Sequence, residues 1–328
     1  METMAEHAIG IHENGGPEVL RYDEVELPPP AAGEVRVRYT AIGLNYVETY
    51  VRSGLYAAGL PTGLGTEAVG VVTEVGEQTF GFAPGDRVGR ATGPLGSYAT
   101  AQNVTAKCLV PIPDEVSDEA AAAVMLKGLT AWYLLRQTYP VKAGETVVFH
   151  AAAGGVGLIA GQWLRHLGVR AIGTAGSTEK AKLAAQHGYS EVILYQEDDV
   201  AARVRELTDG AGVPVVYDSV GAATFENSLD CLRPRGLMVS FGNSSGPVTG
   251  VNLGILAAKG SLFVTRPTMA HYLGGHEDLR TAASELFDLV STGVIQPQIG
   301  QRFALADAAD AHRALESRAT TGSTILVP

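Results

Sequence analysis

The stretch Val147-Val148-Phe149-His150-Ala151-Ala152-Ala153-Gly154-Gly155-Val156-Gly157-Leu158 joins a short apolar run to a helical pattern through a loop of small residues. The run is typical of a β-strand, and the helix is expected to open near Val156. Small residues let backbone N–H groups approach a phosphate, whose charge the positive end of a helix stabilises. The stretch therefore predicts that the pyrophosphate of a dinucleotide is held by the last glycines and the residue between them, Gly154, Gly155, Val156 and Gly157.

The motif alone leaves an alternative open. It departs from G-x-G-x-x-G because Ala152, Gly154 and Gly157 occupy the three small positions. A glycine-rich turn between a strand and a helix, without any ligand, has the same pattern. Other parts of the sequence are needed to distinguish a dinucleotide site from a turn without a ligand.

Composition favours an α/β enzyme that acts on small molecules. The 328 residues suit about two domains, and the net charge of -11, with no block of Lys and Arg, argues against a nucleic-acid partner. Only Cys108 and Cys231 are present, without a C-x-x-C, so neither a disulfide framework nor a cysteine-built metal site is expected. No apolar run is long enough to span a membrane, and we expect a cytoplasmic protein.

Two patterns of expected secondary structure follow one another along the chain. Short β segments punctuated by Gly and Pro indicate an antiparallel, barrel-like module at 35–40, 68–75, 87–90 and 97–102. After a helix that Ser117 is expected to cap, strands and helices alternate from residue 147 to a last strand at 261–265, which indicates a parallel sheet covered by helices on both faces. Helices at 279–292 and 306–317, with a segment at 295–303 between them, indicate a return to the first module. The dinucleotide domain is thus expected to be inserted.

The end of the second strand of this sheet predicts which dinucleotide binds. An Asp or Glu that accepts the ribose hydroxyls of NAD should fall at about Gly176, but no carboxylate occurs from Ala171 to Thr178. Ser177, Lys180 and Tyr195 instead offer two hydroxyls and a cation, which suit a 2′-phosphate. NADPH is therefore the expected cofactor. The alternative is that Ser177 only caps a helix and Lys180 is a solvated charge.

A second set of motifs carries a family resemblance over nearly the whole chain. Gly65-Thr66-Glu67-Ala68-Val69-Gly70 and Pro84-Gly85-Asp86-Arg87-Val88 resemble the G-H-E-x-x-G and G-D-x-V regions of the medium-chain dehydrogenase/reductase superfamily. Where its zinc enzymes have metal-binding Cys and His residues, this chain has Asn45 and Thr66, and Lys127 lies about where a further Cys is expected. These groups cannot replace thiolate and imidazole around zinc, so no metal is expected.

Within this superfamily the chain is similar to the zeta-crystallin-like quinone oxidoreductases, which are zinc-free and NADPH-dependent. The similarity rests on five segments, residues 45–50, 151–157, 217–221, 241–246 and 316–320. It implies that Asn45, Tyr50, Thr130 and Tyr133 lie near the nicotinamide, that Phe241, Asn243 and Ser244 line the cofactor cleft, and that Arg318 approaches the adenosine phosphate. It also implies a homodimer paired through residues 261–265.

The resemblance also completes the expected architecture. A Rossmann-type doubly wound parallel sheet is inserted into a GroES-like, mostly antiparallel β-barrel catalytic domain. The expected boundaries are 1–127 for the first part of the catalytic domain, 128–266 for the NADP-binding domain and 267–328 for the last part.

The expected activity is metal-free reduction of a quinone by NADPH. A quinone is electron-poor, so hydride can pass directly if the protein orients the rings, and Asn45 and Tyr50 are the candidate hydrogen-bond donors to the developing oxyanion. The alternative for Tyr46 and Tyr50 is that both are packing aromatics, and Asp218 is expected to cap a helix rather than to catalyse. Alternatives are reduction of an enone or alkenal double bond, or a mainly NADPH- or RNA-binding, crystallin-like role.

Overall fold

The apolar run that opens the glycine motif forms β9, the first strand of a six-stranded parallel sheet. The spatial order is β11-β10-β9-β12-β13-β14, so the chain moves outward in one direction from β9 and then returns to its other side at β12. Ligands bind in open α/β sheets at such a reversal, beyond the carboxyl ends of the strands. The strands are β9 (Thr146–Phe149), β10 (Arg170–Ala175), β11 (Glu191–Leu194), β12 (Val213–Asp218), β13 (Leu232–Ser240) and β14 (Phe263–Thr265).

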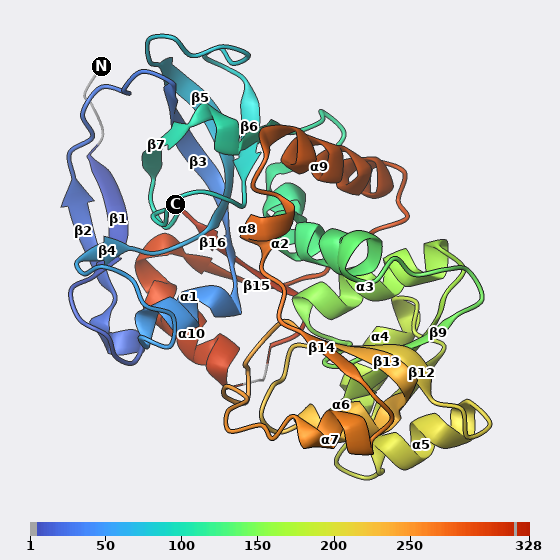
Figure 1. Ribbon diagram of the computed structural model, residues 1–328. Helices are drawn as coiled ribbons and strands as arrows, with labels where there is room; N and C mark the ends of the chain where they lie inside the picture. The colour runs from blue at the N-terminus through green and yellow to red at the C-terminus, as the bar shows by residue number, and fades with distance from the viewer. Residues whose placement is uncertain (1–4, 318–319) are drawn as a thin grey trace. The chain divides into compact units, whose positions relative to one another are not determined.

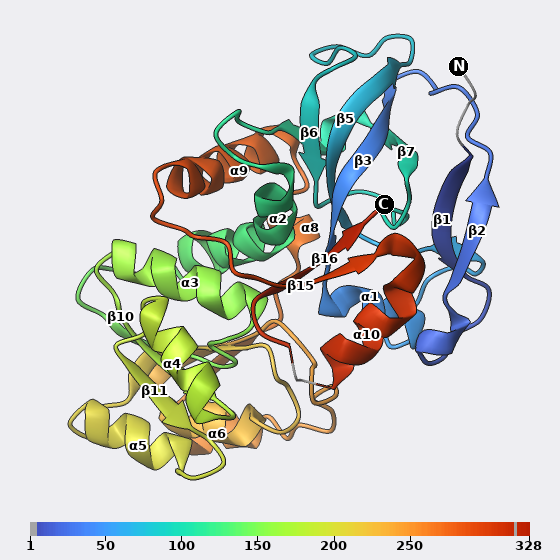
Figure 2. The ribbon, with the colours of Figure 1, turned by 180° about the vertical axis from the view of Figure 1, so that it is seen from behind.

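Helices cover this sheet. One hydrophobic cluster joins buried strand residues such as Val148 and Val216 to α5, α6 and α7, while α3 and α4 pack against β10. The helices of this region are α3 (Gly155–His166), α4 (Thr178–Gln186), α5 (Val200–Leu207), α6 (Phe225–Cys231), α7 (Gly254–Ala258) and α8 (Met269–Tyr272), with a π-helical turn η3 (Leu134–Thr138). Figure 2 shows α3 to α6 around the sheet. The predicted doubly wound arrangement is confirmed.

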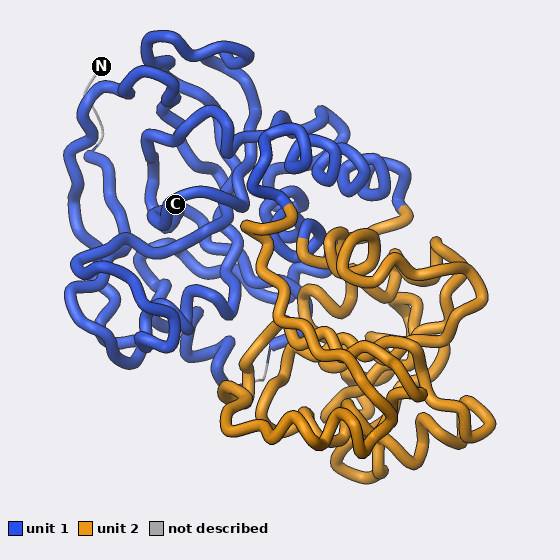
Figure 3. Tube along the Cα trace, viewed as in Figure 1, with its two compact units in different colours: residues 1–129, 273–293, 297–328 blue, residues 130–272, 294–296 orange. Residues whose placement is uncertain are grey.

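The computed structural model describes residues 5–317 and 320–328, which divide into two units (Figure 3). The first unit contains residues 1–129, 273–293 and 297–328, and the second contains residues 130–272 and 294–296. The second unit is therefore inserted into the first, as expected. None of the helices in the described part of the chain is long and apolar enough to cross a membrane.

The first unit is built on a seven-stranded sheet, in the order β15-β16-β3-β5-β6-β8 with β7 on β3, and a three-stranded sheet, β2-β1-β4 (Figure 1). The strands are β1 (Glu6–Ile11), β2 (Arg21–Val25), β3 (Glu34–Leu44), β4 (Thr62–Gly63), β5 (Glu67–Val75), β6 (Arg87–Arg90), β7 (Ala101–Thr105), β8 (Leu109–Pro111), β15 (Ile299–Ala304) and β16 (Ser323–Val327). The helices are α1 (Tyr46–Arg52), α2 (Asp118–Tyr133, whose last residues belong to the second unit), α9 (His276–Ser291) and α10 (Ala308–Glu316), with 3-10 turns η1 (Pro17–Val19), η2 (Ala106–Cys108) and η4 (Leu305–Asp307).

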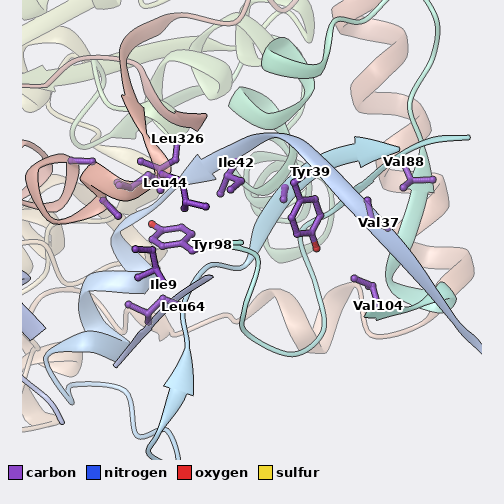
Figure 4. Close-up of a cluster of buried hydrophobic side chains, with 14 of the residues drawn as sticks. Ile9, Val37, Tyr39, Ile42, Leu44, Leu64, Val88, Tyr98, Val104 and Leu326 are labelled. Carbon is purple, nitrogen blue, oxygen red and sulfur yellow. The ribbon is translucent and has the colours of Figure 1, made fainter. Parts of the chain in front are cut away.

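The core of the first unit lies between its sheets and α10. β3 alternates buried and half-buried residues from Val35 to Tyr39 and, after the exposed Thr40, is buried on both faces from Ala41 to Leu44. Its inward side chains pack with Tyr98, Leu64 and Leu326 from three other segments (Figure 4). Because β3 pairs with β5, β7 and β16, it is the central strand that fixes where α1 begins.

Some predicted bounds are wrong. The segment predicted as a strand at 97–102 is ordered by separate backbone bonds, such as Tyr98 N to Leu64 O at 2.9 Å, and the strand β7 begins only at Ala101, where pairing with β3 starts. The last strand of the parallel sheet, predicted at 261–265, begins only at Phe263. The sheet β2-β1-β4 was not predicted, because β2 is almost entirely exposed and lacks an apolar alternation.

Candidate active site

The glycine loop, residues 151–157, lies at the carboxyl end of β9. Ala151 has a φ of 53°, and the loop is closed by Gly154 N donating to Ala151 O at 2.9 Å and by Ala152 N donating to Thr174 O of β10 at 3.0 Å. A Cβ on Gly157 would lie 2.5 Å from Ala151 O and 2.7 Å from Ala152 O. Only glycine therefore allows the helix to approach the loop this closely, which is the role that the motif predicts for its last small residue.

The N-terminus of α3 follows this loop. The N-cap is Gly154, which has no side chain to satisfy the first helical N–H groups, and α3 begins at Gly155, one residue before the predicted start. The first N–H groups of a helix have no partner within it, so those of Gly155, Val156 and Gly157 are oriented toward an incoming anion. The residues predicted to hold a pyrophosphate thus share one helix end and one loop.

The predicted adenosine corner consists of Gly176, Ser177, Lys180 and Tyr195. Tyr195 OH lies against Gly176, since a Cβ there would be 2.5 Å from that oxygen, and the Tyr195 side chain is 50% exposed. Ser177 is the N-cap of α4 and accepts from Lys180 N at 3.3 Å. The structure therefore brings these residues together where β10 and β11 end, and Ser177 does serve as a helix cap.

A carboxylate also lies at this corner. Hydrogen bonds from its own backbone N–H and from the side chain of Ser177 hold the pKa of Glu179 below its usual range. Glu179 occupies the first turn of α4, one residue beyond the segment in which the sequence shows no acid. Its carboxylate points back to the cap instead of occupying the strand end, where a ribose-binding acid would be.

The loops after β12 and β13 pack on each other. Phe241 N donates to Asp218 O at 2.7 Å and Ser244 N donates to Ser219 O at 3.3 Å. With its amide oriented to satisfy both neighbours, Asn243 donates to Gly242 O at 3.0 Å and accepts from Arg266 Nη2 at 2.9 Å. Phe241, Asn243 and Ser244 thus lie at the same edge of the sheet as the glycine loop.

Arg266 was not predicted as a site residue. Its Nη1 donates to Gly242 O at 2.8 Å and to Ser240 O at 3.1 Å, so it braces the loop that carries Asn243. In the sequence it is one arginine beyond the last strand, and nothing near it marks this contact.

Asp218 has the structural role that was expected for it, though not as the N-cap residue itself. Its carboxylate accepts from Val220 N, Gly221 N, Thr224 Oγ1 and Ser228 Oγ at 2.7 to 3.0 Å. These bonds fix the turn that leads into α6, whose N-cap is Thr224.

Thr130 and Tyr133 belong to the end of α2 and to the second unit. Both are buried, at 8% and 4% exposure, and the ring of Tyr133 stacks on that of Tyr272 with centroids 4.9 Å apart. Tyr272, at the end of α8, has no motif that would have singled it out.

In the first unit, Asn45 is the N-cap of α1 and forms a capping box with Glu48. Asn45 N donates to Glu48 Oε2 at 2.8 Å, while the other oxygen of Glu48 accepts from Thr66 N at 3.1 Å and from Thr66 Oγ1 at 2.6 Å. Glu48 is completely buried. Burial raises the pKa of Glu48 from 4.5 to about 7, which the hydrogen bond from Thr66 opposes.

Glu67 joins the remaining groups of this region. Its Oε2 accepts from Asn45 Nδ2 at 3.0 Å and from Lys127 Nζ at 3.2 Å, and its Oε1 accepts from Leu126 N at 2.6 Å. Glu67 and Lys127 are 0% and 5% exposed. A Cβ on Gly43 would lie 2.0 Å from Glu67 Oε2, so a glycine in β3 makes room for the carboxylate.

We call Asn45, Glu48, Thr66, Glu67 and Lys127 the carboxylate network. Three of its members, Asn45, Thr66 and Lys127, stand where the superfamily's zinc enzymes are expected to have metal ligands, and here they are hydrogen-bonded to two buried carboxylates. No group of three or more His, Cys, Asp and Glu side chains that could hold a metal ion occurs in residues 5–317 and 320–328. The sequence drew attention to the three positions but not to Glu48 and Glu67, which connect them.

Tyr50 lies in an aromatic cluster of the first unit. It is 9% exposed, and its ring centroid is 6.2 Å from that of Tyr46 and 5.2 Å from that of Tyr56. Tyr46 OH donates to Leu315 O at 3.0 Å, so Tyr46 has a structural partner. Arg318, the remaining predicted site residue, lies outside the described residues.

Comparison with protein families assigns both units. Residues 31–114 match the alcohol dehydrogenase GroES-like domain, and residues 155–288 match the zinc-binding dehydrogenase family. The expected GroES-like and Rossmann-type architecture is therefore confirmed.

Individual relatives match the whole chain. A quinone oxidoreductase of Pseudomonas aeruginosa is 60% identical over 315 residues, which cover 96% of this chain and 97% of that protein. A 2-haloacrylate reductase of a Burkholderia species is 42% identical over 325 residues, covering 97% and 98%. Among solved structures, Escherichia coli quinone oxidoreductase complexed with NADPH has a TM-score of 0.97 and 52% identity, covering 98% of this chain and 100% of that one.

Proposed function

Because the chain belongs to the quinone oxidoreductase family of the medium-chain dehydrogenases/reductases, we propose that it reduces a quinone with NADPH and without a metal ion. The observation that carries the proposal is the helix end at the glycine loop, combined with a corner in which Ser177 and Tyr195 stand where an NAD-binding protein has a carboxylate. In this proposal residues 128–266 form the NADP-binding domain, and 1–127 with 267–328 form the catalytic domain.

The second unit supplies the groups for NADPH. The N–H groups of Gly155, Val156 and Gly157 hold the pyrophosphate, and Ser177, Lys180 and Tyr195 hold the 2′-phosphate through charge-assisted hydrogen bonds. Five more residues complete the proposed cofactor site: Thr130, Tyr133, Phe241, Asn243 and Ser244, with Asn45 of the first unit and Arg318 beyond the described residues. Bound NADPH supplies the hydride.

In the first unit, we assign Asn45 and Tyr50 to the acceptor. An amide nitrogen carries two protons, and Asn45 Nδ2 donates one of them to Glu67, so the second serves as a donor to an oxygen that gains negative charge. Glu67 also fixes the direction of this donor. The Lys127 ammonium, which donates to the same carboxylate at 3.2 Å, balances the charge of Glu67.

The test is turnover by the purified protein. We expect oxidation of NADPH by quinones, little oxidation of NADH, and no loss of activity with a chelator. Loss of activity on chelation with recovery on adding zinc would contradict the metal-free proposal.

Cofactor choice has a test of its own. Lys180→Ala should raise the KM for NADPH about tenfold or more, since a hydrogen bond to a charged group is lost, and leave the KM for NADH nearly unchanged. Lys142→Ala, an exposed lysine of the same unit, is the matched control. Equal effects on both cofactors would contradict the 2′-phosphate assignment.

A second candidate activity is reduction of an activated carbon–carbon double bond. The 42% identity to a 2-haloacrylate reductase favours it as the alternative, and it needs the same cofactor and a similar oxyanion donor. A panel of quinones, enones and 2-haloacrylates, compared by kcat/KM, separates the two. Higher kcat/KM values for quinones support the main proposal.

We also propose a cytoplasmic homodimer paired through β14. This strand is the edge of the six-stranded sheet, and Phe263 and Val264 on it are 60% and 40% exposed. Such an edge is a template for pairing with a second copy. Sedimentation should give a dimer that Val264→Pro converts to monomer.

A further inference from the structure

A chain of side-chain hydrogen bonds runs through the interior of the second unit, below the glycine loop. Ser228 Oγ donates to Asp218 Oδ2 at 2.7 Å and lies 3.0 Å from His150 Nε2. On the other side of the ring, His150 Nδ1 lies 3.0 Å from Thr174 Oγ1, which accepts from Ala151 N at 3.4 Å. His150, Thr174, Asp218 and Ser228 are all at most 2% exposed.

The direction of every bond in this chain follows from its ends. The Asp218 carboxylate can only accept, so the Ser228 hydroxyl donates to it and has a lone pair left for His150 Nε2–H. A neutral imidazole then has an unprotonated Nδ1, which accepts the Thr174 hydroxyl proton. The Thr174 oxygen in turn accepts the N–H of Ala151. Burial lowers the pKa of His150 below its ordinary value, in agreement with a neutral ring.

The chain of hydrogen bonds ends at Ala151 of the glycine loop. Ala151 has a positive φ of 53°, its carbonyl accepts from Gly154 N at 2.9 Å, and the same carbonyl faces Gly157. A non-glycine residue adopts this conformation only where its surroundings impose it. His150 directly follows β9, Thr174 is the penultimate residue of the neighbouring β10, and Asp218 ends β12 on the other side of β9. The hydrogen-bond chain therefore crosses the point where the strand order reverses.

We propose that His150 is a positioning residue that holds the glycine loop, through Thr174, in the conformation that binds the pyrophosphate of a dinucleotide. This inference rests on the proposed function, because it assumes that the loop binds NADPH. No role in proton transfer to substrate is assigned to His150. It acts on binding by fixing one tautomer and, with it, the orientation of Thr174.

The direct test removes one hydroxyl. Thr174→Val keeps the shape of the side chain and removes the link to Ala151, so we expect the Kd and the KM for NADPH to rise about tenfold, while kcat changes less than about twofold. Thr138→Val is the matched control, because the buried Thr138 Oγ1 of the same unit has no hydrogen-bond partner. Ser228→Ala should raise the Kd for NADPH as Thr174→Val does. Ser228→Thr, which keeps the hydroxyl, should bind NADPH more tightly than Ser228→Ala.

Two measurements keep this test separate from the proposed function. NADPH binding is followed by tryptophan fluorescence without any quinone. If the wild-type protein does not bind NADPH, the proposed function fails. If the wild type and Thr174→Val bind NADPH equally, only the positioning role fails.

The tautomer provides a readout on the unchanged protein. In a ¹⁵N spectrum of the wild type, His150 should show a protonated Nε2 and an unprotonated Nδ1. A proton on Nδ1 would overturn the proposal even if the variants fail to fold.

Discussion

The carboxylate network of the first unit and the glycine loop of the second are held in opposite ways. The network buries two carboxylates and an ammonium, and its members come from α1 and its N-cap, from β5 and the residue before it, and from α2. The glycine loop is one contiguous segment held by backbone hydrogen bonds and by the Thr174 hydroxyl, which in turn contacts the buried His150. One site therefore depends on compensation of charge, and the other on backbone geometry.

Each arrangement depends on one glycine at which a side chain would collide. Gly43 leaves room for the Glu67 carboxylate, and Gly157 leaves room for the carbonyls of Ala151 and Ala152. The difference predicts how each site fails. Removing a charge should damage the network most, whereas adding a methyl group should be enough to damage the loop.

The largest effect is expected from breaking the buried ion pair. Glu67→Gln leaves the Lys127 ammonium buried without its counter-charge, which should destabilise the first unit by about 3–5 kcal/mol. The measurement is hydrogen exchange of the β3 and β5 amides, since the tryptophans Trp132 and Trp163 both belong to the second unit.

The control for this prediction is the double variant Glu67→Gln/Lys127→Met. Replacing both partners removes the uncompensated charge, so most of the lost protection should return. If the double variant is less stable than Glu67→Gln, the ion pair is not the reason for the loss, and the network is not organised by charge.

Glu48 gives the carboxylate network a pH dependence of its own. Folding raises the pKa of this carboxyl group from 4.5 to about 7. Between these two pH values the group is protonated in the folded state and ionised in the unfolded state. Its contribution is fully present below pH 4.5 and is lost as the pH rises through 7, which amounts to about 3 kcal/mol. As the pH rises through 7, the wild type should lose protection from hydrogen exchange in the first unit, whereas Glu48→Gln, which cannot ionise, should not. Parallel pH curves would contradict the raised pKa.

The glycine loop should respond to volume. Gly157→Ala places a methyl group 2.5 Å from Ala151 O, so the helix and loop must separate, at a cost of about 1–3 kcal/mol. We expect the Kd for NADPH to rise about tenfold or more in a fluorescence titration. Gly59→Ala, where a Cβ would meet no atom within 4 Å, is the control. Unchanged binding by Gly157→Ala would show that the close approach is dispensable.

The same contrast explains which parts were predictable from the sequence. The glycine loop, β9 and α3 are contiguous, so apolar periodicity and small residues predict them together with the alternating strands and helices of the sheet. The corner of Gly176, Ser177 and Tyr195 was also predictable, because carboxyl ends of neighbouring parallel strands meet at one edge.

The carboxylate network could not be predicted in the same way. Glu48 reads as an ordinary first-turn acid of a helix, and the contact of Glu67 with Lys127 exists only after β5 and α2 have packed in the first unit. The tautomer of His150 likewise depends on Ser228, which lies on α6, a helix that packs against β12 and β13. Side-chain pairs between distant segments leave no periodic signal in one sequence.

The smallest effect is expected for Glu179, a charged residue beside the proposed 2′-phosphate site of the second unit. Its carboxylate accepts the Ser177 hydroxyl in the first turn of α4, close to the groups proposed for the 2′-phosphate, so it opposes that phosphate electrostatically. Glu179 is exposed and therefore screened by solvent.

Glu179→Gln should lower the KM for NADPH about two- to fivefold and leave that for NADH unchanged. Glu206→Gln on α5 makes the same charge change on another helix and should alter neither. If Glu179→Gln instead raises the KM for NADPH, the carboxylate supports the corner by orienting Ser177, and geometry rather than charge governs this site as well.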